Sequence, residues 1–319
     1  MQEIIIDSSN ENRRFDKFLK IYFQNATSGF IYKMLRKKNI TLNGKKDSGS
    51  SLLKQGDVIN VYFSDDTFNK MRGLNTSQNE FDYYKGIDYK LDVIYEDDDI
   101  IACNKPAGLL SQKSKDNDIS INEYIVSYLI KEKGYSLEEY RTFHPSVSNR
   151  LDYNTTGVIL AAKTLKGQQN LSHALKYHEL EKYYICICVG VIKEEMTLSA
   201  QLSKDTDNNK VTISDKRDGN ITTKIYPIRS NSHISLLKIQ LLTGKTHQIR
   251  AHLAHIGHPI IGDMKYGNKE VNELYRQKYG IITQALHSYT TYYDNKKITA
   301  PLPGALQRLI EEEYGNVEL

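Results

Sequence analysis

Residues 149–162 have the sequence NRLDYNTTGVILAA, in which a polar run containing Arg150 and Asp152 leads directly into an apolar, strand-like run. An acid beside an arginine at the entrance to a strand can be held ionised and directed at a substrate. Such a carboxylate is suited to act as a nucleophile. The same residues fit equally well a structural ion pair between Asp152 and Arg150. The rest of the sequence has to decide between the two.

Length and composition indicate a globular protein with two domains. The chain has 319 residues, against ~150 for an average domain, with 39% hydrophobic and 26% charged residues. The start of the sequence lacks the features of a secretory signal, and no segment approaches the ~20 apolar residues that span a bilayer. We therefore expect a cytoplasmic protein without a membrane segment. Cys103, Cys186 and Cys188 lie in apolar surroundings, which favours buried, reduced thiols.

Charge is distributed unevenly along the chain. Residues 1–75 carry 13 Lys and Arg against 8 Asp and Glu, whereas residues 76–100 carry 2 against 8. The remainder is mildly basic, with 28 against 23, and the whole chain has a net charge of +4. A basic N-terminal block can attract phosphate groups, although many such blocks are only solvated faces.

The basic block has the pattern of a small module. Residues 13–23 and 28–38 each place apolar side chains on one helical face, the second after a plausible cap at Ser28. Asn43-Gly44 predicts a tight turn, and residues 57–63 alternate like a strand. Six basic residues on or beside the helices can form one surface that attracts phosphate groups: Arg13, Arg14, Lys33, Arg36, Lys37 and Lys38. Alternatively, the last three only form a polar helix end with favourable charges.

Residues 64–90 are polar and irregular, which predicts a linker to a second unit. That unit has helical patterns at 121–130 and 168–176 and strand-like runs at 91–95, 100–103, 157–162, 183–189, 222–228, 234–242 and 285–292. Strands and helices do not alternate regularly, so we expect an α+β domain with a mixed, mainly antiparallel sheet. The acids at 96–99 lack the spaced ligands of a calcium loop and predict a hairpin tip.

A second cluster occupies residues 242–263, LTGKTHQIRAHLAHIGHPIIGD. Its four histidines do not have the spacing of a zinc site, so we expect no metal. A helix that begins near Thr246 would place His247 and Arg250 on one face, where Arg250 can point into a cleft. Tyr183 and Tyr184 are candidates for stacking on a planar base, although core or surface positions are the more common fate of tyrosines.

Four runs, in this order and spacing, resemble the RluA family of RNA pseudouridine synthases: YEDDDIIACNKPAGLLSQ, NRLDYNTTGVILAAKT, EKYYICICVG and LLTGKTHQIRAHLAHIGHPIIGDMKYG. The resemblance covers about residues 85–305 and implies a catalytic domain over 91–305. Residues 12–63 resemble the alpha-L RNA-binding domain first described in a small-subunit ribosomal protein. The RluC and RluD branches of the family carry such a domain.

The resemblance also implies roles for individual residues. Asp152 would be the nucleophilic carboxylate, and Arg250 would pair with it and keep it charged. Tyr184 would stack on the target base and transfer a proton, and Arg150 would occupy the space left by the extruded nucleotide. Lys245 and His247 lie in the same motif as Arg250 and are expected on the substrate side, whereas Ile249 is a packing residue. The reaction needs no cofactor.

Three positions depart from the commonest family pattern. Asn149 stands where histidine is frequent, Thr156 where serine is usual, and Lys245 where arginine is more frequent. The first two are compatible with the same turn. Lysine, however, is a point charge that cannot reproduce the two-pronged contact of arginine with phosphate.

The expected function is isomerisation of specific uridines in structured RNA by a protein that acts as a monomer. Large-subunit ribosomal RNA is the first candidate and transfer RNA the second, with single strands and loops as targets. A ribosome-associated RNA-binding protein without catalysis is the alternative from another class. A carboxylate glycosidase fits less well, because glycosidases generally need a second carboxylate across the bond.

Overall fold

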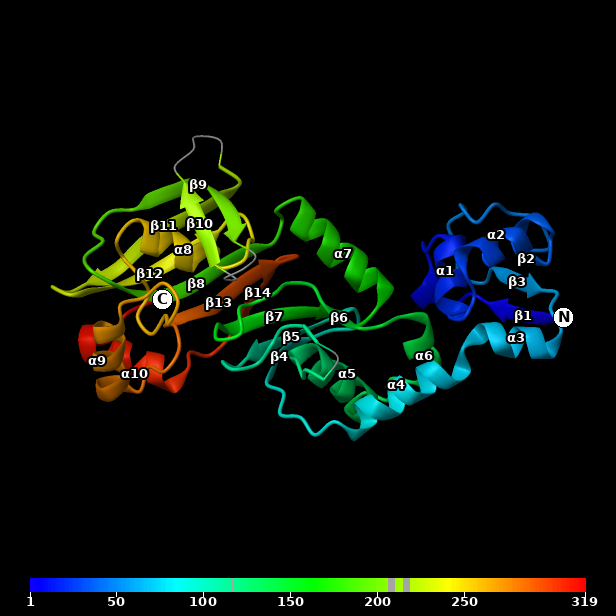
Figure 1. Cartoon of the computed structure of the whole chain (residues 1–319), viewed down its shortest axis with the longest axis horizontal. Helices are drawn as coiled ribbons and strands as arrows, with labels where there is room; N and C mark the ends of the chain where they lie inside the picture. Colours follow the sequence, from blue (N-terminus) through cyan, green and yellow to red (C-terminus); the bar gives the residue numbers. More distant parts are fainter. Residues whose placement is uncertain (116, 206–209, 215–218) are drawn as a thin grey trace.

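The chain forms a small N-terminal module and a larger body built around one sheet (Figure 1). The computed structural model describes residues 1–115, 117–205, 210–214 and 219–319. Helices and mainly antiparallel strands occur in both units, which confirms the predicted α+β class.

The N-terminal module (residues 1–63) packs two helices against a three-stranded antiparallel sheet with strand order β1-β3-β2. Its elements are β1 (Gln2–Ile5), the 3-10 helix η1 (Ser8–Asn10), α1 (Phe15–Tyr22), α2 (Ser28–Arg36), β2 (Ile40–Leu42) and β3 (Val58–Val61). The apolar faces predicted for the two helices are buried in one core. Ile4 and Ile6 belong to the same core, although they precede residue 12.

One helix cap and one turn of the module can be compared with the predictions for them. The cap of α2 is Thr27 and not Ser28, because the Thr27 hydroxyl accepts the N–H of Phe30 at 3.3 Å. The turn at Asn43-Gly44 is confirmed. Both residues have positive φ angles, 50° and 70°, as a tight two-residue hairpin turn requires.

The connection between the two units is helical and not irregular. It contains α3 (Asp65–Arg72) and α4 (Leu74–Gly86). Ser64 caps α3 through the N–H of Thr67, and Phe81 of α4 is buried against Tyr140. The segment is polar overall, so its narrow apolar stripe was not recognised in the sequence. Such a stripe is sufficient to pack a helix against a neighbouring unit.

The body contains an eleven-stranded sheet within the described residues. Nine strands follow the order β10-β9-β11-β12-β8-β13-β7-β5-β4, with β6 paired to β7 and β14 to β13. Their bounds are β4 (Val93–Glu96), β5 (Ile100–Lys105), β6 (Ser146–Val147), β7 (Thr156–Ala162), β8 (Glu181–Val189), β9 (Met196–Asp205), β10 (Lys210–Ser214), β11 (Ile221–Ser230), β12 (Ile234–Leu241), β13 (Leu286–Tyr293) and β14 (Lys296–Thr299).

The pair β7 and β13 joins the two halves of this sheet. It is parallel, whereas the other strand pairs of the described sheet are antiparallel, and its register comprises two positions, His287 with Thr156 and Ser288 with Gly157. Gly157 has a φ of 109°, and a Cβ there would lie 2.1 Å from the Ser288 carbonyl oxygen. Only glycine permits the strands to approach this closely.

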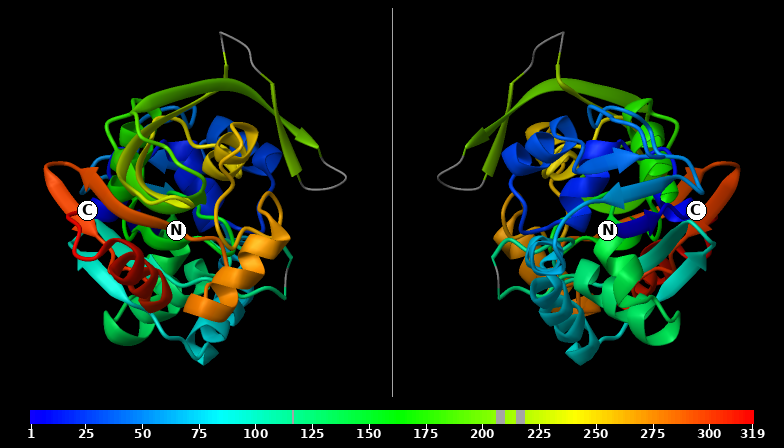
Figure 2. Two further views of the ribbon diagram at one scale, coloured as in Figure 1. Left: turned by 90° about the vertical axis from the view of Figure 1, so that its left-hand side faces the viewer. Right: turned by 90° about the vertical axis from the view of Figure 1, so that its right-hand side faces the viewer.

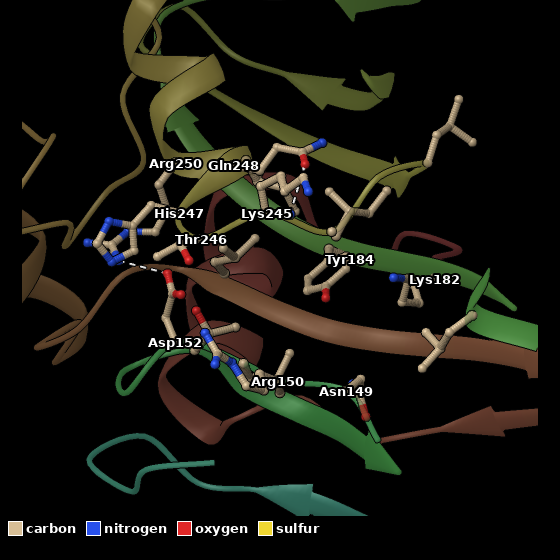
Figure 3. Close-up of a pocket in the computed structure, with 18 of the residues that line it drawn as sticks. Asn149, Arg150, Asp152, Lys182, Tyr184, Lys245, Thr246, His247, Gln248 and Arg250 are labelled. Atoms are coloured by element: carbon tan, nitrogen blue, oxygen red, sulfur yellow. Dashed lines mark hydrogen bonds and ion pairs between the residues drawn. The ribbon is translucent and has the colours of Figure 1, made fainter. Parts of the chain in front are cut away.

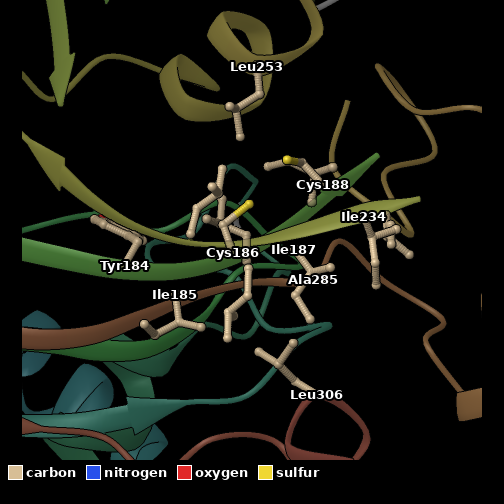
Figure 4. Close-up of a cluster of buried hydrophobic side chains, with 14 of the residues drawn as sticks. Tyr184, Ile185, Cys186, Ile187, Cys188, Ile234, Leu253, Ala285 and Leu306 are labelled. Carbon is tan, nitrogen blue, oxygen red and sulfur yellow. The ribbon is translucent and has the colours of Figure 1, made fainter. Parts of the chain in front are cut away.

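Helices cover both halves of the sheet. Their bounds are α5 (Ile121–Glu132), α6 (Leu137–Thr142), α7 (Leu165–Lys176), α8 (Gln248–His255), α9 (Lys269–Tyr279) and α10 (Gly304–Tyr314). In Figures 1 and 2, α8 lies on one side of the sheet, and α9 and α10 lie on the other. Figure 4 shows the resulting core, with Leu253 of α8 above strand β8 and Leu306 of α10 below it. Because Leu306 is buried in this core, the body continues past residue 305.

The three cysteines are buried free thiols, as predicted. Burial raises the pKa of the Cys188 thiol to about 12, so it stays protonated near neutral pH. Among the described residues, no helix is both long enough and apolar enough to cross a membrane.

Candidate active site

A cavity of about 460 Å³ lies beside the junction of the two sheet halves. Its walls come from the loop before β7, the edge of β8 and the loop that leads into α8. Six residues singled out in the sequence line it: Arg150, Asp152, Tyr184, Lys245, His247 and Arg250 (Figure 3). Residues from positions 150 and 250 therefore meet in one site.

Asp152 forms an ion pair with Arg250 across this cavity. The Nη1 of Arg250 lies 2.8 Å from Oδ2 of Asp152, with side-chain exposures of 9% and 22% respectively. Within the described residues, no ion pair joins Asp152 to Arg150. The pairing partner of the carboxylate is thus the distant arginine, and the alternative of a local structural pair does not hold.

The backbone on both sides of Asp152 is fixed by buried polar groups. The hydroxyl of Ser111 donates to the Leu151 carbonyl at 2.8 Å and accepts the Leu151 N–H at 2.9 Å. The Nζ of Lys105 donates to the Tyr153 carbonyl at 3.1 Å and to two further carbonyls of its own turn. Because the peptide groups are held, Asp152 is directed at the cavity without much freedom to reorient.

Lys105 is a fully buried cation close to the candidate carboxylate. Burial lowers its pKa to about 8, an effect that the negative charge of Asp152 opposes. The ammonium group has three hydrogens and donates to three carbonyls, so its hydrogen-bonding capacity is fully used. Lys105 therefore acts on the site through the backbone.

Arg250 is held from the other side by Asp263, a fully buried carboxylate. Its Nε lies 2.7 Å from Oδ2 of Asp263 and its Nη2 lies 2.9 Å from Oδ1. Burial opposes the charge, but hydrogen bonds and charge from Asp263 and then Asp152 outweigh it and raise the pKa of Arg250. The bidentate contact leaves Nη1 for Asp152.

Tyr184 forms part of the cavity wall on β8 (Figure 3). It is only 5% exposed, and burial raises its pKa to about 12, with a hydrogen bond to Ser288 acting against the shift. The phenol is therefore a neutral hydroxyl near pH 7. An aromatic ring and a proton donor are present within one cavity with Asp152.

His247 departs from its predicted setting. Helix α8 begins at Gln248, and His247 is its cap residue with a left-handed φ of 55°, so it does not share a helix face with Arg250. Its Nδ1 lies 3.0 Å from the hydroxyl of Tyr266, and burial lowers its pKa. Both His247 and Arg250 still line the cavity, because the loop turns sharply at residue 247.

Gln248 sets the position of that loop. Its side-chain amide donates to the Thr222 carbonyl and to the Thr223 hydroxyl, both at 3.0 Å. Its Oε1 accepts the N–H of Lys245 at 3.2 Å. The Lys245 side chain is exposed at the cavity wall, as is that of Arg150.

The two other unusual positions have local structural partners. Asn149 accepts the N–H of Leu160 at 2.7 Å and donates to the Val158 carbonyl at 3.3 Å. The Thr156 hydroxyl lies 2.7 Å from Nδ1 of His287. Asn149 thus binds the middle of β7, whereas Thr156 links the start of β7 to β13.

The basic residues of the module lie apart from this cavity. Lys33, Arg36, Lys37 and Lys38 are exposed at the end of α2. Arg14 is exposed but pairs with Asp16 at 3.1 Å. Arg13 departs from the predicted surface. It is only 5% exposed and donates to the Thr142 carbonyl of the body, so it connects the two units.

Within the described ranges, no three His, Cys, Asp or Glu side chains are grouped so that they could hold a metal ion. Two of the clustered histidines have other partners. His252 is buried against the Thr223 hydroxyl at 2.9 Å, and His258 lies 2.9 Å from the Val189 carbonyl.

Sequence reasoning missed Asp263, Lys105 and Ser111 as parts of the site. Each lies in or beside one of the four motifs, but its partner is 13 to 48 residues away in sequence. A charged residue at the end of a strand-like apolar run was the available signal: Asp263 follows Ile260-Ile261-Gly262, and Lys105 lies two positions after Cys103.

A sequence model of the family described as RNA pseudouridylate synthase matches residues 99–255. The chain is 32% identical over 308 residues to "Ribosomal large subunit pseudouridine synthase C" of Rickettsia prowazekii, which covers 93% of this chain and 96% of that relative. It is also 32% identical to an uncharacterized RNA pseudouridine synthase of Mycoplasma genitalium, over 90% of this chain and 87% of the relative. Among solved structures, Human RNA Pseudouridylate Synthase Domain Containing 4 superposes with a TM-score of 0.54 at 18% identity, over 77% of this chain and 98% of that one.

Proposed function

This chain belongs to the RluA family of RNA pseudouridine synthases and is an isomerase of that type, and on this premise we propose that it converts specific uridines of large-subunit ribosomal RNA to pseudouridine with Asp152 as its catalytic carboxylate. The observation that carries the proposal is the Asp152–Arg250 pair of 2.8 Å inside the cavity. Relatives named as synthases of the large ribosomal subunit support the substrate.

The chemistry requires a single carboxylate at the ribose. The bond between C1′ and N1 of uracil breaks, the base rotates within the site, and C1′ bonds to C5. The proton leaves C5 and N1 gains one, so the product is an isomer. Asp152 acts either by attacking C1′, as retaining glycosidases do, or by removing a neighbouring ribose proton. Arg250 engages Oδ2 of the carboxylate, so Oδ1 is the oxygen that the arginine leaves for the substrate.

The remaining cavity residues are suited to an extruded nucleotide. Removing a base from its stack costs a few kcal/mol. Stacking on Tyr184 and insertion of the exposed Arg150 into the vacated position partly offset this cost. Tyr184 also holds a neutral hydroxyl that can move a proton between base and solvent. Lys245 and His247 contact the flanking sugar and phosphate groups.

We also propose that residues 12–63 are an alpha-L RNA-binding domain whose exposed end, with Lys33, Arg36, Lys37 and Lys38, binds RNA phosphates. Residues 64–90 then connect it to a catalytic domain that starts at residue 91. The protein acts as a monomer in the cytoplasm, where ribosomal RNA is available.

The test is Asp152→Asn, assayed on large-subunit ribosomal RNA from cells that lack the enzyme, with pseudouridine detected by chemical labelling. We expect RNA binding to persist and product formation to disappear. Asp98→Asn, which removes an exposed carboxylate at the β4–β5 turn, is the control and should remain active. An active Asp152→Asn enzyme would refute the assignment. Modification of transfer RNA alone would overturn the ribosomal substrate. Unchanged modification in a deletion strain would favour a binding protein without catalysis.

A further inference from the structure

Helix α7 lies between the sheet of the body and the N-terminal module (Figure 1). At its C-terminal end, Leu175 and the following His178 line the active-site cavity. At its N-terminal end, Gln168 and Gln169 line a cleft of about 720 Å³ whose other wall belongs to the module. A groove of about 420 Å³ runs between the two ends on the helix surface. One helix therefore borders three hollows in succession.

The C-terminal end of this face carries an exposed aromatic platform. Tyr177 is 55% exposed, and its ring centroid lies 4.4 Å from that of His173. The Nζ of Lys176 lies 5.0 Å from the centre of the same ring. An exposed tyrosine with an adjacent cation is the combination that stacks on a nucleobase and binds its phosphate.

The far end of the face is also basic. Arg14 and Lys17 line the module side of the cleft, and both side chains are exposed. Arg14 is paired with Asp16, whereas no ion pair to Lys17 is present in the part of the chain that the structure describes. The position of the cleft is fixed, because the buried Arg13 donates to the Thr142 carbonyl at its floor.

Two acids border the same surface, and each has a partner. Glu80, in the cleft, accepts the hydroxyl of Tyr140 at 3.1 Å. Glu179, beyond the helix, lies 3.2 Å from Nδ1 of His173. Both acids are thus engaged in local contacts, whereas Lys17 and Lys176 place cations at opposite ends of the surface.

We propose that this face of α7, together with Lys17 of α1, is an RNA-binding track. The RNA that flanks the target nucleotide runs along it from the cavity to the module. The track is defined by Lys17, Gln168, Gln169, His173, Lys176 and Tyr177. The inference rests on the proposed function, because Leu175 and His178, which flank Lys176 and Tyr177 in sequence, line the cavity that takes the target base. Twelve helical residues span roughly 18 Å.

RNA fits the surface better than a protein partner does. The side chains that line the groove on this face are amides, a hydroxyl, a cation and aromatic rings, with no aliphatic side chain among them. A solvated helix face without a ligand is the competing interpretation, and the experiment distinguishes the two.

The experiment compares Lys176→Glu, Tyr177→Ala and Lys17→Glu with the wild type, in filter binding over a salt series and in turnover on the same ribosomal RNA. Loss of one stacked base corresponds to ~1–3 kcal/mol, so Tyr177→Ala should raise KM about 5- to 150-fold. Tyr177→Phe should restore binding. Each Glu variant should lower the slope of log K against log salt by about 1. Lys269→Glu at the start of α9, on the far side of the body, is the charge-matched control.

RNA length provides an independent measurement. With transcripts that carry the modified uridine and progressively longer flanks, sensitivity to Lys176→Glu should appear at shorter flanks than sensitivity to Lys17→Glu. If the three variants bind every RNA as the wild type does while the wild type still forms pseudouridine, the track is wrong and the proposed function stands. If the wild type modifies no RNA, the proposed function fails, and filter binding alone still tests the track.

Discussion

Asp263 holds the guanidinium of Arg250 through two hydrogen bonds of 2.7 and 2.9 Å, on the side away from Asp152. The same Oδ1 also accepts the backbone N–H groups of Lys265 and Tyr266, at 2.8 and 3.1 Å. The guanidinium thus has one fixed orientation, and its remaining Nη1 reaches the candidate carboxylate. Burial opposes the charge on Asp263, but these donors, led by Arg250, lower its pKa.

Asp263→Asn should therefore reduce both stability and turnover. Removing one member of a buried ion pair costs about 3–5 kcal/mol, and the lower end is expected here because Asp152 still faces Arg250. Urea unfolding measures this loss. Glu273→Gln, which breaks an exposed pair with Arg276, is the control and should leave the stability nearly unchanged, because solvent screens this pair. Equal effects of the two substitutions would contradict the role given to Asp263.

Tyr184→Phe separates the ring from the hydroxyl. The phenylalanine ring keeps the stacking surface, so the dissociation constant for RNA should stay within about twofold. If the hydroxyl transfers a proton, kcat should fall by the 10²- to 10⁴-fold typical of general acid–base groups. Tyr184→Leu should in addition weaken binding. A Tyr184→Phe enzyme with an unchanged kcat would restrict Tyr184 to stacking.

The exposed end of α2 should contribute to RNA affinity through charge. Lys37→Glu with Lys38→Glu should weaken binding to all RNAs and flatten its salt dependence by about 0.7–0.9 for each phosphate that the module no longer neutralises. The catalytic step at saturating RNA should be retained. Lys193→Glu with Lys269→Glu, both exposed on the body, is the matched control. Unchanged binding across the salt series would count against the module as an RNA-binding domain.

Acid should destabilise the body through buried histidines. Burial lowers the pKa of His287 and of His252 to about 4 each, from 6.5. Between pH 6.5 and 4 the unfolded state therefore binds more protons, so stability falls with decreasing pH, by up to roughly 3 kcal/mol per histidine. Denaturant unfolding between pH 7 and 4.5 measures the slope. His252→Gln should flatten it, whereas His233→Gln, at an exposed position, should not.

Elements with a strong apolar period were predictable from the sequence. Strands β7 and β8 and helices α1 and α7 lie where the patterns indicated, because burial alone fixes such segments. Helices α4 and α9 were not predicted. Tyr275 and Tyr279 of α9 are the aromatic part of a short buried stripe within an otherwise polar sequence. A stripe this narrow becomes informative only when the surface that it contacts is known.

Site residues were predictable where they lie in a motif of chemically reactive residues. They were not predictable where their position depends on contacts with residues far away in the sequence. Asp152 and Arg250 stood out because each lies in a dense polar motif, and they meet as expected. The prediction that His247 shares a helix face with Arg250 was wrong. The left-handed turn at His247 depends on contacts of Gln248 with Thr222, which the local sequence pattern does not contain. Arg13 was misplaced for a similar reason, since its partner Thr142 lies in the other unit.

The junction between β7 and β13 has a mechanical consequence for the site. Asp152 precedes β7 on one half of the sheet, and Arg250 lies on α8, which covers the other half. The described β7–β13 pairing comprises two positions, so a small rotation there would strain few backbone hydrogen bonds but would directly change the gap between carboxylate and guanidinium. The distance between Asp152 and Arg250 therefore depends on the geometry of the β7–β13 junction. Any change in this gap would alter the contact through which Arg250 holds Asp152 in its charged form.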